Sequence, residues 1–199
     1  NKTIEKMTST LINRGPNFQD TYIDENVALG HTRLSILDLS SAGNQPMKIS
    51  YNENEYIIVY NGEIYNAPEL RKQLQQLGYD FFSTSDTEVM VTAYIEWQER
   101  CVDYLNGIYA FAIWNAELEQ LFLCRDHLGV KPLFYVQHRT GILFASEIKA
   151  LLAHPSVKAE VDSDGLAALL SLGPSRITGH AIFNGLHELK PAHVMIVRR

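Results

Sequence analysis

The chain has 199 residues and a mass of 22.5 kDa, near the upper size of a single domain with one substantial core. Hydrophobic residues make up 46% of the sequence and charged residues 20%, a balance typical of a folded soluble protein and too apolar for a disordered one. The formal net charge is -6 and no basic tract offsets it, which excludes nucleic acid as an expected partner.

Apolar runs such as 57–60 and 110–114 are too short to cross a bilayer, and no signal-peptide pattern opens the chain. We therefore expect a cytoplasmic protein without a membrane partner. Cys101 and Cys124 lie far apart and form no CxxC pair. This spacing favours buried thiols over a disulfide framework, and no metal site is expected.

Helical and strand patterns alternate in the first half of the chain. The chain opens with a predicted helix that ends at residues 14–16. Its apolar stripe consists of Ile4, Met7, Leu11 and Ile12. We expect strand segments at 27–31 and 34–37, with a break at Thr32-Arg33, and a buried strand at 56–60 that ends at Asn61-Gly62. Helices are expected after Asn66 and from Asp86 onward.

Short β runs dominate the second half and predict an antiparallel meander over 108–114, 121–125, 133–136 and 142–145. Helices are expected at 146–152 and 165–172, and a last strand at 194–197. Helices grouped between strand groups indicate an α+β fold with helices outside antiparallel sheets. The expected linkers, 155–161 and 173–185, predict a main domain over 1–160 and a C-terminal extension over 161–199.

Three polar features could together bind a free α-amino acid. Asn61-Gly62 follows a buried strand, where a loop can offer an amide and a backbone N–H to an oxyanion; the alternative is a plain strand-to-helix turn. Arg33 could grip a carboxylate through two N–H bonds, or form a structural ion pair with Asp38. Asp86 could hold an ammonium group, or simply cap a helix.

Other common catalytic patterns are missing from the sequence. It contains no GxGxxG, GxxxxGK[ST], HExxH or GxSxG motif. His31 and His127 could act as acid–base groups, but single histidines on strands or turns are more commonly structural, which is the role we expect for them.

Six blocks of the sequence resemble the glutaminase domain of asparagine synthetases, a class II glutamine amidotransferase. They follow the family's order over nearly the whole chain: RGP at 14–16, RLSILD at 33–38, NGEIYN at 61–66, SDTEV at 85–89, RDHLGVKPLFY at 125–135 and SEIKALL at 146–152. The resemblance implies an N-terminal-nucleophile hydrolase fold, which is a four-layer αββα sandwich of two antiparallel sheets between helical layers.

The resemblance also implies a glutamine site, which maps onto nine residues of this chain: Arg33, Leu34, Ser35, Ile36, Leu37, Asn61, Gly62, Glu63 and Asp86. In the family pattern, the Arg holds the glutamine carboxylate and the four residues after it line the site. The Asn and Gly of NGE form the oxyanion hole, and the two acidic residues hold the substrate's amino group.

The sequence departs from the family pattern at two places. The family usually reads HRGPD where residues 13–17 read NRGPN. Family members also begin with a Cys whose thiol attacks glutamine and whose α-amine serves as the base. Here Asn1 stands in the first predicted helix, so the first strand and the nucleophile are expected to be missing. Either the recorded chain is truncated or it is a degenerate homologue; the retained pocket residues favour truncation.

The sequence therefore predicts a glutamine amidotransferase that hydrolyses glutamine to glutamate and ammonia, for asparagine synthesis from aspartate and ATP. The recorded chain alone is expected to be inactive. The alternatives are a non-catalytic amino-acid-binding or regulatory module and a structural domain that docks a synthetase. No cofactor is expected in this domain, while ATP and Mg are expected in the synthetase domain. The expected partners are L-glutamine and that synthetase domain. The sequence is also compatible with a homodimer.

Overall fold

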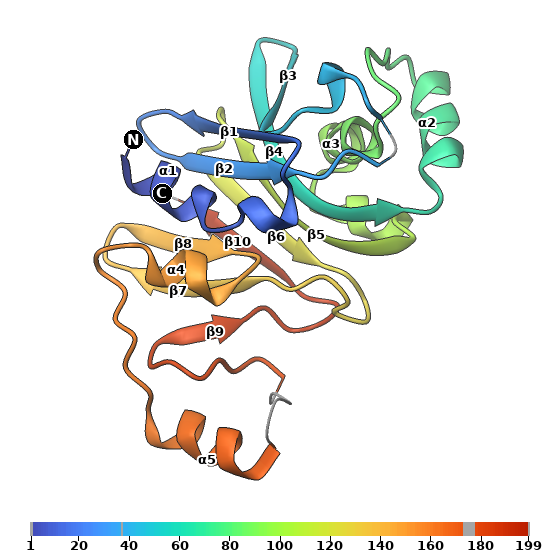
Figure 1. The fold of residues 1–199 in the computed structure, drawn as a ribbon. Coiled ribbons are helices and arrows are strands. Elements are labelled where there is room, and N and C mark those ends of the chain that lie inside the picture. Colours follow the sequence, from blue (N-terminus) through green and yellow to red (C-terminus); the bar gives the residue numbers. More distant parts are fainter. Residues whose placement is uncertain (1, 37, 173–177, 199) are drawn as a thin grey trace.

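The computed structural model describes residues 2–36, 38–172 and 178–198, and its strands pair in antiparallel sheets (Figure 1). The largest sheet has the strand order β10-β6-β5-β4-β3: β3 is Met47–Tyr51, β4 Asn54–Ile64, β5 Gly107–Asn115, β6 Gln120–Arg125 and β10 Val194–Arg198. A second sheet has the order β8-β7-β9: β7 is Phe134–His138, β8 Gly141–Ala145 and β9 Leu186–Glu188. The strands β1, Phe18–Ile23, and β2, Ala28–Arg33, form a separate pair.

The α-helices surround these sheets. They are α1 (Lys2–Ser9), α2 (Ala67–Gln76), α3 (Asp86–Trp97), α4 (Ile148–Leu152) and α5 (Ser163–Leu172). Short 3-10 turns, named η1 to η3, cover Ile12–Arg14, Ser41–Gly43 and Gln98–Tyr104. In Figure 1, α2 and α3 lie on one side of the large sheet, and α5 lies apart from the sheets at the bottom of the view.

Alternation along β4 divides the core into layers. Tyr56 and Ile58 point to one face of the large sheet, where they pack with the apolar residues of α2 and α3. Ile57 and Val59 point to the other face and pack against residues of the two smaller sheets. Each such fully buried aliphatic side chain contributes about 1.5–3 kcal/mol to folding.

A third apolar cluster joins α1 and α4 to the second sheet through Met7, Phe134 and Leu151. The order of layers is therefore helix, sheet, sheet, helix, with the small β1-β2 pair sharing the third layer. This arrangement confirms the α+β sandwich that the sequence predicts.

The prediction of a strand at 34–37 is wrong for residues 34–36, which the structure describes. β2 continues without a break through Arg33 and ends there, and 34–36 belong to no strand. Asn17 supplies the reason, because its side chain accepts the Ser35 N–H where a strand would need a backbone partner. Leu34 and Ile36 are 54% and 71% exposed, so this apolar run packs into no sheet. Leu37 lies outside the described residues.

The loop expected at Asn61-Gly62 is also wrong. β4 runs on to Ile64, and residues 61–63 pair with 108–110 of β5. The strand is long because β5 pairs with it from Tyr56 to Ile64, whereas its other neighbour, β3, pairs only as far as Ile58.

The region 161–199 contributes α5, β9 and β10. β9 pairs with β7, and β10 pairs with β6 at the edge of the large sheet. The division of the chain into a main domain over 1–160 and an extension over 161–199 stays a prediction. Residues 173–177 of the expected linker lie outside the described residues. Across the described ranges, no helix has the length and apolarity needed to span a membrane.

Candidate functional site

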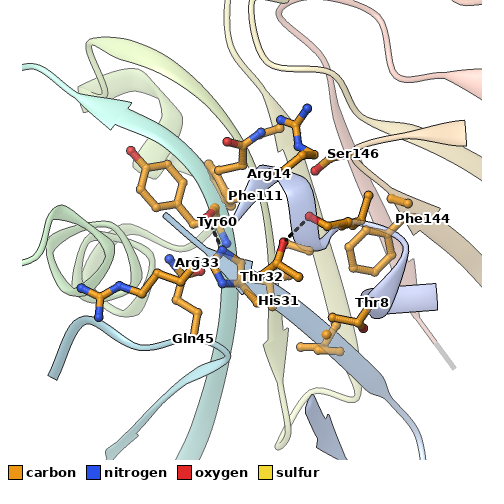
Figure 2. Close-up of a pocket in the computed structure, with 18 of the residues that line it drawn as sticks. Thr8, Arg14, His31, Thr32, Arg33, Gln45, Tyr60, Phe111, Phe144 and Ser146 are labelled. Atoms are coloured by element: carbon orange, nitrogen blue, oxygen red, sulfur yellow. Dashed lines mark hydrogen bonds between the residues drawn. The ribbon is translucent and has the colours of Figure 1, made fainter. Parts of the chain in front are cut away.

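A cavity of about 660 Å³ lies between the layers, bounded by β2, β4, β5, β8 and α1. Its volume suits a small ligand. Six of the predicted site residues line it: Arg33, Leu34, Ile36, Asn61, Gly62 and Asp86. Figure 2 shows His31, Arg33 and Gln45 gathered on one side of the cavity, with Phe144 and Ser146 on the opposite side.

The edge of β4 is open toward this cavity. In an antiparallel strand the backbone groups of alternate residues point to opposite neighbours, and the even-numbered residues of β4 pair with β3 up to Ile58. Beyond β3 the same edge continues through Tyr60, Gly62 and Ile64. The Tyr60 N–H donates to Gln45 Oε1 at 2.6 Å, and the Ile64 N–H donates to Asp86 Oδ2 at 3.1 Å. Alternation therefore directs the Gly62 N–H to the open edge between these two bonds.

Gly62 is required at this place by close packing. A Cβ at this position would lie 2.7 Å from Tyr109 Cα and 2.9 Å from Tyr60 Cε2, and still closer to the Ile108 carbonyl oxygen. Only glycine lets β4 approach β5 this closely while keeping its own N–H on the open edge.

Asn61 points to the face of β4 that Ile57 and Val59 share, toward the cavity. Its Nδ2 atom is buried and finds no hydrogen-bond partner among the residues that the structure describes. A buried amide N–H without a partner is costly, so this group is ready to donate to an oxygen of a ligand.

Asp86 begins α3 but does not cap it. Ser85 is the N-cap, and its side chain accepts the Thr87 N–H. Asp86 Oδ2 instead accepts the Tyr60 hydroxyl at 2.7 Å in addition to the Ile64 N–H. Burial, and then the negative charge of Asp86, raises the pKa of Tyr60, so the hydroxyl keeps the proton that it donates.

Arg33 is buried at the end of β2 and uses three N–H groups on one loop. Nη1 donates to the Ser40 carbonyl and to Asn44 Oδ1, each at 2.7 Å, and Nη2 donates to the Asp38 carbonyl. A Cβ on Gly43 would lie 3.1 Å from Arg33 Cζ, so glycine makes room for the guanidinium. A guanidinium has five N–H donors, so two remain beyond these three bonds to described residues.

The alternative of an ion pair between Arg33 and Asp38 is not found in the described part of the chain. The Asp38 carboxylate accepts the Ser40 and Thr84 hydroxyls and their backbone N–H groups. These bonds, those from Ser40 foremost, lower the pKa of Asp38 to about 2. Asp38 therefore ties the loop after β2 to the segment that precedes α3.

Two predicted residues do not line the cavity. Ser35 is tied through its backbone to Asn17. Glu63 is exposed and lies two residues from Asn61 on the same face of β4, which places it about 7 Å further along the strand. Leu37 lies outside the described residues, so the structure does not place it.

The sequence does not reveal the importance of Gln45 and Tyr60 to this site. Gln45 is buried, accepts the Tyr60 N–H and donates through Nε2 to Thr87 Oγ1 at 3.2 Å. It occupies a loop and belongs to no periodic pattern, so no local signal marks it. His31, expected to be structural, does bond the Tyr60 carbonyl through Nε2 at 3.1 Å.

Neither cysteine lies at the cavity. Cys101 and Cys124 are buried in the cluster beneath α3, where burial raises the pKa of Cys101 to about 12 and raises that of Cys124 as well. Among the described residues, no group of three His, Cys, Asp or Glu side chains could hold a metal ion.

A family model described as a glutamine amidotransferase domain matches residues 1–199. The chain belongs to this glutamine amidotransferase domain family. It is 50% identical over 194 residues to asparagine synthetase [glutamine-hydrolyzing] 3 of Bacillus subtilis, a match that covers 98% of this chain and 31% of the relative. Asparagine synthetase [glutamine-hydrolyzing] 1 of the same organism is 38% identical over 181 residues, which is 89% of this chain and 28% of that protein. The chain thus spans about 30% of the length of these relatives.

A solved structure shares the fold. The glutamine phosphoribosylpyrophosphate amidotransferase from B. subtilis, complexed with ADP and GMP, matches 86% of this chain and 32% of its own, with a TM-score of 0.59 and 23% identity. At this identity the likeness concerns the fold, and it agrees with the layered sandwich described above.

Proposed function

We propose that this amidotransferase domain binds L-glutamine in the cavity between its layers. The observation that carries the proposal is the pair of N–H donors on β4, the buried Asn61 Nδ2 without a partner and the Gly62 N–H on the open edge. Two such donors, fixed by a sheet, suit the oxygen of a carboxamide as it gains negative charge.

The other predicted residues supply the remaining contacts of an amino acid. Arg33 offers its two remaining N–H groups to the α-carboxylate, and Asp86 offers Oδ1 to the α-ammonium, since its described bonds use Oδ2. Glu63 lies outside the cavity lining, so it needs a longer reach to share the ammonium.

In the proposed reaction the α-amine of an N-terminal cysteine takes the proton of its thiol, and the thiolate attacks the amide carbon while the oxyanion forms against Asn61 and Gly62. The amine then returns that proton to the leaving nitrogen, which departs as ammonia as the C–N bond breaks and the thioester forms. Water then hydrolyses the thioester to release glutamate. Cys101 and Cys124 are buried away from the cavity, so neither can serve as the nucleophile. Following the family resemblance, we assign the attack to an N-terminal cysteine, which the 199 residues do not contain.

Two of the relatives, over their own longer sequences, are named as glutamine-hydrolysing asparagine synthetases. We infer that ammonia made here passes to a synthetase domain that uses aspartate, ATP and Mg to make asparagine. That acceptor, the absence of a cofactor in this domain and the homodimer stay predictions.

Calorimetry of the chain with L-glutamine tests the binding step, with D-glutamine as the control for the placing of carboxylate and ammonium. Binding of the L-form alone is expected. Ammonia release by the protein with its N-terminal cysteine then separates the enzyme from the alternative of a non-catalytic binding module. Binding of glutamine without ammonia release would support the module.

A further inference from the structure

Two buried side-chain nitrogens without hydrogen-bond partners in the described residues belong to the same cavity. They are Asn61 Nδ2 and His31 Nδ1, and both residues line the cavity. A third such atom, Trp114 Nε1, belongs to a residue outside the cavity lining. Buried polar groups without partners are rare in proteins, so two at one cavity point to a ligand that pairs with them.

The hydrogen bond of His31 determines which of its nitrogens carries the proton. Nε2 lies 3.1 Å from the Tyr60 carbonyl oxygen, and a carbonyl can only accept, so Nε2 must be the N–H. Burial, and then the positive charge of Arg33, lowers the pKa of His31 to about 4, so the ring is neutral near pH 7. Nδ1 is therefore a bare acceptor.

The bond also places the ring beside the oxyanion donors. The Tyr60 carbonyl belongs to the peptide that joins Tyr60 to Asn61, and Figure 2 shows His31 directly against Tyr60 with this bond dashed. A buried acceptor on His31 and a buried donor on Asn61 thus flank one peptide of β4.

We propose that His31 Nδ1 accepts an N–H of the substrate carboxamide while Asn61 Nδ2 donates to its oxygen, so that the pair selects glutamine over glutamate. The inference rests on the proposed function and assigns a specificity role to His31. A carboxamide carbon bears an oxygen that accepts hydrogen bonds and an NH₂ group that donates two. A carboxylate carbon bears two oxygens, and both only accept. Glutamate would bring an anionic oxygen against the Nδ1 lone pair, which favours release of the product.

Two variants separate the two nitrogens of His31. His31→Gln keeps an amide N–H that reaches the Tyr60 carbonyl and removes the ring acceptor at Nδ1. His31→Asn places an amide near the position of Nδ1 and gives up the bond to Tyr60. Calorimetry at about pH 7 compares the Kd values of the chain for glutamine and glutamate, and circular dichroism checks that each variant is folded.

The Kd for glutamate divided by the Kd for glutamine should fall roughly tenfold or more in His31→Gln, because glutamine loses a hydrogen-bond partner and glutamate loses a repulsive contact. His31→Asn should keep more of the preference. An unchanged ratio in folded His31→Gln, with glutamine still bound, would overturn the role of His31 and leave the proposed function standing. Failure of the unchanged chain to bind glutamine would overturn both.

A measurement on the unchanged chain does not depend on the folding of a variant. With ¹⁵N-labelled histidine, the Nδ1 resonance of His31 should report a bare nitrogen before ligand is added. It should move toward the hydrogen-bonded position with glutamine and not with glutamate. A protonated Nδ1 in the free chain, or the same movement with both ligands, would refute the proposal.

Discussion

Gly62→Ala should destabilise the fold by forcing β4 and β5 apart. The added Cβ would lie 2.7 Å from Tyr109 Cα and 2.9 Å from Tyr60 Cε2, where ordinary contacts begin at 3.4 Å. The nearest obstacles are backbone atoms of β5, which cannot rotate away as a flexible side chain could. Overpacking of this kind typically costs about 1–3 kcal/mol.

Gly141→Ala is the matched control for this change. Gly141 has a φ of 147°, near the 159° of Gly62, but a Cβ there would meet nothing within 4 Å. The two changes share the effect on backbone freedom in the unfolded chain, so their difference isolates the collision. With a urea m value of about 2 kcal/mol/M, the midpoint of Gly62→Ala should lie about 0.5–1.5 M below that of Gly141→Ala. Equal midpoints would show that β4 and β5 can separate freely, and would refute the close-packing argument.

Further predictions concern the loop after β2 and the site itself. Arg33→Ala should weaken glutamine binding in calorimetry at least tenfold, and Arg33→Lys should restore it only in part, because an ammonium lacks the planar fork; unchanged binding would move the carboxylate site elsewhere. Asp38 has its pKa held at about 2, below its ordinary 3.8, so it stabilises the fold above about pH 4 and this contribution disappears as the pH falls to about 2. Asp38→Asn should therefore lower the free energy of unfolding by on the order of 1–2 kcal/mol at about pH 7 and by almost nothing near pH 2 in urea titrations; an equal loss at both would contradict this. In the protein with its N-terminal cysteine, Asn61→Ala should lower kcat roughly 100-fold with little change in KM, and Asp86→Ala should mainly raise KM; a kcat within a few-fold for Asn61→Ala would remove it from the oxyanion hole.

The parts of the fold that follow from local sequence were predictable. α3 begins at Asp86 as expected, and the buried strand around Ile57 and the four strands between 108 and 145 are present. The single meander expected for those four strands is wrong, because β5 and β6 pair in the large sheet whereas β7 and β8 pair in the second sheet, where β9 and not β6 is the other neighbour of β7. Each confirmed element depends on residues near one another in the chain, either through the spacing of apolar positions or through turn residues. The blocks that resemble the family likewise lie on short continuous segments, and six of the nine residues predicted from them line the cavity.

The shape of the cavity could not be predicted in this way, because it arises where two neighbouring strands differ in length. β3 stops pairing at Ile58 while β5 holds β4 in the sheet as far as Ile64. The exposed edge is then completed by side chains from distant segments: Gln45 and His31 at Tyr60, and Asp86 at Ile64. No sequence pattern within β4 predicts these partners. For the same reason, Asn61-Gly62 taken alone favours the interpretation as a turn. Since those side chains satisfy the backbone on both sides of Gly62, the open position that the proposed reaction uses is itself a product of the tertiary fold.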